Sequence, residues 1–112
     1  MRRGLALGAV AITGTAVWGQ SQERVIKVVA RKFAFLPADI PVKLGEAVIL
    51  EITSPEVVMG FYAPDLNLRA VLVPNEVARL RFAATRAGTF AFICDIFCGD
   101  GHEGMSGRIV VA

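Results

Sequence analysis

The feature of this sequence that most restricts its fold is a series of short apolar runs separated by turn-forming residues. In the run AVILEIT, Val48, Leu50 and Ile52 occupy alternate positions, so they share one face of an extended strand. Comparable runs occupy residues 24–33, 47–53, 77–84, 88–94 and 107–112. Beyond residue 22, no stretch has the period or the caps of a helix. Short strands joined by Gly- and Pro-containing turns predict an antiparallel β-sandwich or barrel.

The N-terminal residues have a different composition. Arg2 and Arg3 precede an uncharged apolar run from Gly4 to Gly19, a pattern typical of a secretory signal. This run of 16 residues is shorter than the ~20 that a transmembrane helix needs. We therefore expect a signal peptide at residues 1–19 and one domain at residues 20–112. The alternative is an uncleaved anchor, through which alone the chain would associate with a membrane.

The charge of the expected domain excludes one class of partner. Without Arg2 and Arg3, ten basic residues are balanced by ten acidic ones. A domain with no excess of positive charge has no basic face for nucleic acid. The chain also has no nucleophile–base pair, phosphate-binding loop or carboxylate dyad, so we do not expect an enzyme.

Both cysteines and the only histidine lie close together near the C-terminus, in the pattern Cys94-x3-Cys98-x3-His102-x2-Met105. Glycines between them allow the backbone to fold tightly around a small object. Two thiolates, an imidazole and a thioether form a soft set of donors, and a thioether points to copper in particular. Zinc rarely takes methionine as a ligand. The spacing therefore predicts a copper-binding loop.

Two simpler interpretations of this loop stay open. Cys94 and Cys98 could form a disulfide, since an exported chain enters an oxidising compartment. Zinc could bind there with Asp95, Asp100 or Glu103 as a fourth ligand. Neither interpretation accounts for the methionine in the pattern.

The loop, placed between the last two predicted strands, resembles that of the cupredoxin domain with a dinuclear CuA centre. Such domains occur in cytochrome c oxidase subunit II and in nitrous oxide reductase. The stretch FAFLPADIPVKLGEAVILEITSPEVV is similar to the N-terminal half of many small cupredoxins, so the resemblance covers nearly the whole expected domain. It implies an all-β fold, a Greek-key β-sandwich.

The resemblance also implies a set of copper ligands. Cys94 and Cys98 would bridge two copper ions through their thiolates. His102 and the backbone carbonyl of Ile96 would bind one copper, and Met105 would bind the other. The acidic residue that subunit II has between the two cysteines is absent, because Ile96 stands there.

The sequence departs from the family upstream of the loop. The family has a further histidine ligand just before an aromatic residue, whereas the corresponding segment here is EVVMGFYAP, with Met59 at that position. We expect Met59 to face the metal; the alternative is a core methionine. A thioether is a weaker donor than imidazole and favours Cu(I), so the reduction potential should rise. Both a dinuclear and a mononuclear copper site remain open.

These inferences predict an exported, periplasmic or extracytoplasmic copper protein. It would pass single electrons to or from a respiratory redox partner such as a cytochrome or terminal oxidase. The alternative is a Cu(I)-binding protein that delivers copper for copper-site assembly. A thiol–disulfide protein is a third possibility, although the thioredoxin-like βαβ pattern is lacking.

An apolar docking surface for the redox partner is expected near the loop. It would include Phe61, Tyr62 and Phe97. The alternative is that Phe61 and Phe97 belong to the core.

Overall fold

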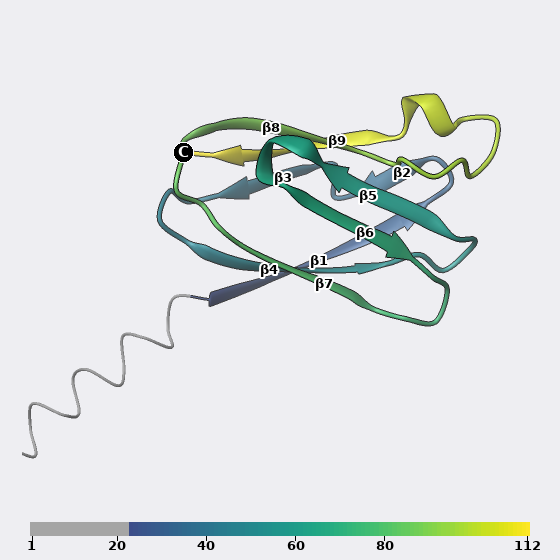
Figure 1. Ribbon diagram of the computed structural model, residues 1–112, viewed down its shortest axis with the longest axis horizontal. Helices are drawn as coiled ribbons and strands as arrows, with labels where there is room; N and C mark the ends of the chain where they lie inside the picture. The colour runs from purple at the N-terminus through teal and green to yellow at the C-terminus, as the bar shows by residue number, and fades with distance from the viewer. Residues whose placement is uncertain (1–22) are drawn as a thin grey trace, which may run out of the picture.

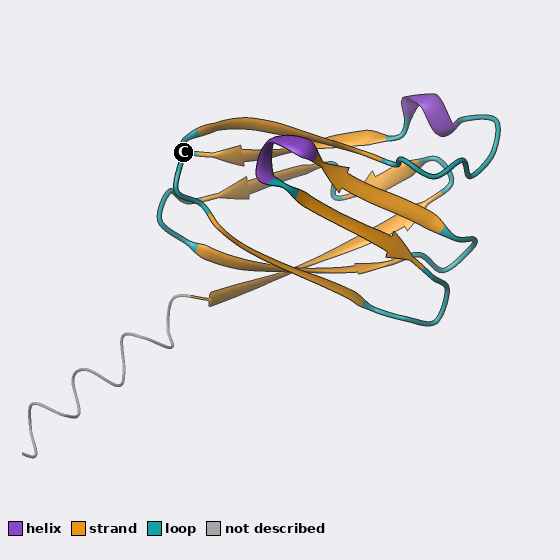
Figure 2. Cartoon of the chain, in the orientation of Figure 1, coloured by secondary structure: helices purple, strands orange, loops and turns teal. Residues whose placement is uncertain are grey.

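The structure, a computed structural model, describes residues 23–112. The predicted signal or anchor segment lies outside the described residues. Within them, nine strands form two sheets that pack face to face (Figure 1 and Figure 2). The first sheet has the order β2 (Ala34–Leu36), β1 (Glu23–Arg31), β4 (Ala47–Thr53), β7 (Ala78–Ala83). The second has the order β3 (Asp39–Val42), β9 (Ser106–Val111), β8 (Gly88–Ile93), β5 (Met59–Ala63), β6 (Leu68–Leu72).

The predicted all-β, Greek-key β-sandwich is confirmed. Each of the five predicted runs contains a strand. The only helices in the described part of the chain are two three-residue 3₁₀ turns, η1 (Pro64–Leu66) and η2 (His102–Gly104). No helix there is long and apolar enough to cross a membrane.

The expectation of purely antiparallel pairing is wrong for two pairs of strands. β1 pairs with β4 in parallel, and β3 pairs with β9 in parallel. Between β1 and β4 the chain crosses to the second sheet, where it adds β3, before it returns to the first. Parallel neighbours need such a crossover, whereas antiparallel neighbours can be joined by a short turn.

Four strands, β2, β3, β5 and β6, lie outside the five predicted runs. Of these, β3 and β6 are the edge strands of the second sheet, where a strand needs hydrogen-bond partners on one side only. Pro41 is tolerated in β3 for this reason, because an edge strand has a side on which no ladder donor is required.

The core is centred on three phenylalanines that connect the two sheets. Phe35 on β2 meets Phe61 on β5 and Phe92 on β8 edge to face, with ring centroids 5.9 and 5.0 Å apart. Phe61 and Phe92 lie 4.7 Å apart within the second sheet. All three side chains are fully buried. Phe61 is therefore a core residue, as the alternative interpretation predicted, and it does not contribute to an exposed docking surface.

Replacing Phe35 with alanine should lower the free energy of unfolding by about 3–5 kcal/mol, because a large buried ring leaves a cavity. Urea denaturation of the metal-free chain measures this loss. Phe97→Ala is the matched control, since its ring is 70% exposed. The control should change the free energy by only about 0.5 kcal/mol. Equal losses in the two variants would contradict this packing.

Candidate metal centre

The loop between β8 and β9, residues 94–105, extends beyond one end of the sandwich (Figure 1). Backbone hydrogen bonds hold its two ends together and shape its middle. The Cys94 N–H donates to the Met105 carbonyl at 3.1 Å. The His102 N–H donates to the Gly99 carbonyl at 3.2 Å, and the Met105 N–H to the His102 carbonyl at 3.1 Å. The adjoining strands thus fix the positions of the first and last donors of the loop.

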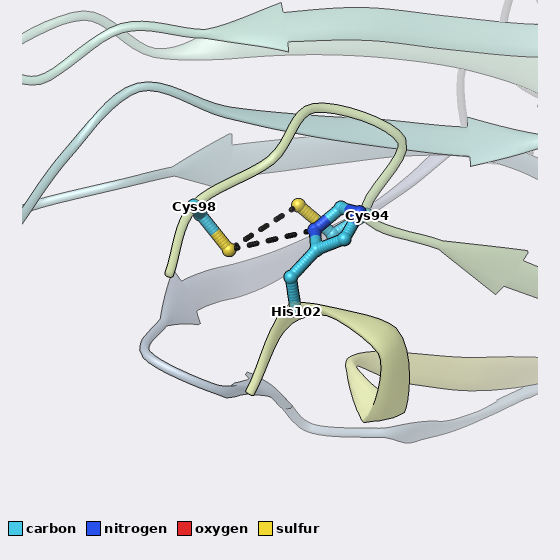
Figure 3. A group of neighbouring side chains, drawn as sticks. All are labelled: Cys94, Cys98 and His102. Atoms are coloured by element: carbon cyan, nitrogen blue, oxygen red, sulfur yellow. Dashed lines mark hydrogen bonds between the residues drawn. The ribbon is translucent and has the colours of Figure 1, made fainter. Parts of the chain in front are cut away.

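The loop brings together the four side chains of the predicted pattern. The sulfur of Cys98 lies 3.8 Å from the Cys94 sulfur, 3.8 Å from His102 Nδ1 and 3.9 Å from Met105 Sδ. Figure 3 shows both sulfurs and the imidazole turned toward a common point. The Cys94 thiol also donates to the backbone carbonyl of Ile96 at 3.2 Å. Five potential metal donors therefore surround a small volume.

The donors differ in how far they are exposed to solvent. Cys94 is 3% exposed and Met105 is 1% exposed, whereas Cys98 and His102 are partly exposed. Both thiols are free. A centre with its inner donors buried and its imidazole near the surface is protected from solvent and still accessible to a partner at one side.

The pKa of the Cys98 thiol is raised in the metal-free protein. Burial is the main cause, the adjacent Cys94 thiol adds to it, and the positive charge of Lys32 opposes it. A thiol with a raised pKa stays protonated at neutral pH. A metal that binds this sulfur as thiolate must therefore displace a proton, so its binding should strengthen as the pH rises.

Phe33 supports the loop from the β1–β2 connection. A Cβ atom on Gly101 would lie 2.5 Å from the Phe33 ring, and one on Gly99 would lie 2.9 Å from it. Gly99 also has a φ of 140°, a backbone conformation that other residues rarely adopt. The ring can approach the backbone of the loop only because both positions are glycine. The spacing pattern gave no sign of this contact, since Phe33 is distant in the sequence.

Met59 lies on the inner face of β5, in the same buried cluster as Cys94 and Met105. Its side chain is fully buried. Tyr62 pairs with Ile93 across the β5–β8 seam, and continuing this antiparallel register places Gly60 opposite Asp95. Met59 and Phe61 flank Gly60, so their side chains point to the core. Met59 is thus the first residue of β5, with its side chain directed into the core. Its role as a ligand remains a prediction.

Among the described residues, no carboxylate joins the group of Cys94, Cys98 and His102, whose donor atoms lie within 4.8 Å of one another. Asp95 instead pairs with Arg69, while Asp100 and Glu103 are exposed. The fourth zinc ligand that the alternative interpretation requires is therefore not supplied by any of these three residues. No spacing pattern in the sequence links Arg69 to the loop, so the sequence alone does not predict this ion pair.

The surface beside the loop is apolar at Phe97. Its side chain is 70% exposed, and its ring centroid lies 5.6 Å from that of His102. Tyr62 is partly buried. Of the three residues predicted for a docking surface, Phe97 is thus the one that the structure exposes most fully.

The fold and the cluster define a class of protein: a β-sandwich with a cysteine–histidine metal site in the loop before its last strand. The chain belongs to the cupredoxin-like domain family, whose profile matches residues 4–111. This fold together with the Cys/His cluster indicates copper binding.

Several known proteins are similar to this chain. Cytochrome c oxidase subunit 2 of Thermus thermophilus is 37% identical over 86 residues, which cover 77% of this chain and 64% of that protein. A solved heme-copper terminal oxidase dimer contains a chain with a TM-score of 0.74 and 26% identity, covering 83% of this chain and 67% of that one. The periplasmic domain of subunit II of cytochrome oxidase from Bradyrhizobium japonicum shares the fold, with a TM-score of 0.73 at 18% identity, covering 79% and 83% of the two chains. The chain spans less than two thirds of the length of the Thermus relative.

Met59→Leu should change the free energy of unfolding of the metal-free chain by less than about 1.5 kcal/mol, because leucine conserves the buried volume. Met59→Ala should lower it by about 2–5 kcal/mol, because it leaves a cavity. Chemical denaturation measures both values. If the alanine variant is as stable as the wild type, Met59 does not occupy the core position described.

Proposed function

We propose that this chain holds a CuA-like copper centre and passes single electrons between redox partners. The observation that supports this proposal most directly is the position of Cys98 Sγ. It lies within 3.9 Å of a second thiol, an imidazole nitrogen and a thioether sulfur. Two thiols this close can bridge two metal ions, and the remaining donors are distributed around them. Residues Cys94, Cys98, His102 and Met105 with the Ile96 carbonyl would hold the copper, and Met59 would complete the site.

The chemistry of these donors fits copper and not a harder metal. Thiolate and thioether sulfurs are soft ligands that favour copper, and the imidazole suits both of its oxidation states. When bound, copper would supply a one-electron couple. The chain itself contributes a rigid frame, because the hydrogen bonds at the ends of the loop connect its donors to β8 and β9. Donors held in this way move little when the charge of the site changes, which favours rapid electron transfer.

The burial of the site supports a carrier more than an enzyme. The inner donors are shielded by the sandwich, so no substrate has a direct approach to them. The exposed Phe97 ring beside His102 offers a short route from the site to a bound partner. We therefore propose that the chain is an electron-transfer component and not by itself a catalyst.

The location and partner form part of the same proposal. The relatives named above include a periplasmic domain and a chain of a terminal oxidase. We propose that residues 1–19 direct export, and that the domain works outside the cytoplasm with a cytochrome or terminal oxidase as partner.

The direct test is to load the full-length chain with copper and to measure the copper content and the paramagnetic resonance spectrum. Two coppers per chain, with the seven-line pattern of one electron shared by two nuclei, are expected. One copper per chain with a four-line pattern would contradict the dinuclear proposal. Loading with zinc in preference to copper would contradict the copper proposal altogether.

A second candidate function is Cu(I) binding and delivery. It is favoured by the replacement of the family's upstream histidine by Met59, which leaves His102 as the only imidazole in the chain. Fewer nitrogen donors reduce the stability of Cu(II) in the site. Repeated oxidation and reduction distinguishes the two functions: a carrier keeps its copper through many cycles, whereas a delivery protein loses it on oxidation or transfers it to an apo-oxidase domain.

Replacing Met59 with histidine should lower the reduction potential, because imidazole stabilises Cu(II) more than a thioether does. Each tenfold change in the relative affinity for the two oxidation states shifts a one-electron potential by about 59 mV. Met59→Leu is the matched control, since it removes the sulfur and conserves the volume. Equal potentials and equal spectra in all three proteins would show that residue 59 does not face the copper.

A further inference from the structure

A pair of oppositely charged residues lies on the outer face of the second sheet, directly behind the metal loop. Arg69 on β6 donates from Nε to Oδ2 of Asp95 at 2.5 Å. Asp95 is the residue between Cys94 and Ile96, both of which contribute atoms to the cluster. The ion pair therefore connects the middle of this segment to a strand two positions away in the sheet.

The carboxylate of this pair is more enclosed than its cation. The Asp95 side chain is 17% exposed, although that of Arg69 is 52% exposed. The second carboxylate oxygen, Oδ1, is buried and has no hydrogen-bond partner among the described residues. Arg69 is therefore the one described partner of a carboxylate that is mostly shielded from solvent, and its removal would leave that carboxylate without a compensating charge.

The neighbouring strand is shaped to admit this carboxylate. β5 lies between β8 and β6, and a Cβ atom on Gly60 would overlap Asp95 Oδ1 and lie 3.1 Å from Ile96 Cγ1. Only glycine at this position lets Asp95 cross β5 and reach Arg69. On β6, Val71 lies opposite Gly60 and Arg69 lies opposite Tyr62. The Arg69 side chain therefore reaches Asp95 from a position two residues along the strand.

We propose that Arg69 and Asp95 form a positioning pair that holds the Cys94–Ile96 segment against the sheet. By fixing the Asp95 backbone, the pair sets where the Ile96 carbonyl lies relative to the Cys94 sulfur, at 3.2 Å. The consequence for a bound metal rests on the proposed function, since the carbonyl is there one of the copper donors. The consequence for the loop itself does not depend on metal.

The test compares wild type with Arg69→Gln and Asp95→Asn, each of which removes one charge of the pair and leaves a polar side chain. Arg79→Gln is the matched control, because it breaks a similar Arg Nε–carboxylate pair, with Glu51 at 3.1 Å, on the other sheet. Arg69→Lys retains the charge and should restore part of any effect. Circular dichroism establishes that each variant is folded.

In the metal-free chain, amide hydrogen exchange of residues 94–98 should be faster by about tenfold or more in Arg69→Gln and in Asp95→Asn. In the copper-loaded chain, both variants should shift the reduction potential and the copper–thiolate absorption. Arg79→Gln should leave all these quantities at their wild-type values. The effects of the two pair-breaking changes should not add in the double variant, because either one already removes the interaction.

Unchanged loop exchange in both variants, or an equal change in the Arg79→Gln control, would overturn the positioning role. If amide exchange changes but the reduction potential and the copper–thiolate absorption do not, the pair has no effect on the copper site. If the chain does not bind copper, the proposed function fails while the exchange experiment still decides whether the pair holds the loop. The two failures are therefore distinguishable.

Discussion

Contact between the two sheets through Phe35, Phe61 and Phe92 is the interaction on which the site depends. Phe92 lies two residues before Cys94, and Phe61 lies two residues after Met59. Because the side chains of alternate residues share a face, the rings that join the sheets also direct Cys94 and Met59 toward the core. The inward orientation of these two side chains thus follows from the packing of the sandwich.

Three glycines allow other parts of the chain to pack closely against the loop. Gly60 lets the Cys94–Ile96 segment lie close to β5, and Gly99 and Gly101 let Phe33 lie close to the other part of the loop. The loop is consequently supported on two sides: by the sheet behind its first residues and by an aromatic ring against its middle. Contacts on both sides can thus hold donors that lie far apart in the loop, although its glycine-rich sequence would be flexible in isolation.

The sequence predicted the fold class and the proximity of Cys94, Cys98, His102 and Met105, because strand alternation and short-range spacing are local signals. It did not predict β2, β3, β5 or β6, which lie outside the predicted runs and form strands through pairing with other strands of the sheets. It left Phe61 and Phe97 undecided, since burial of an aromatic residue is determined by the partner sheet. The Arg69–Asp95 pair was missed because its members meet only when three strands are assembled.

The proposed function requires that the loop hold copper through the sulfurs of Cys94 and Cys98, which in a dinuclear site would bridge the two ions. X-ray absorption at the copper edge of the copper-loaded chain tests it most directly, since it measures the neighbours of each metal ion. If the proposed dinuclear site is correct, the spectrum should contain a short copper–copper vector and sulfur scattering from both thiolates, and the copper–copper vector should be lost in Cys98→Ser. A spectrum with sulfur and nitrogen neighbours but no copper–copper vector would contradict it.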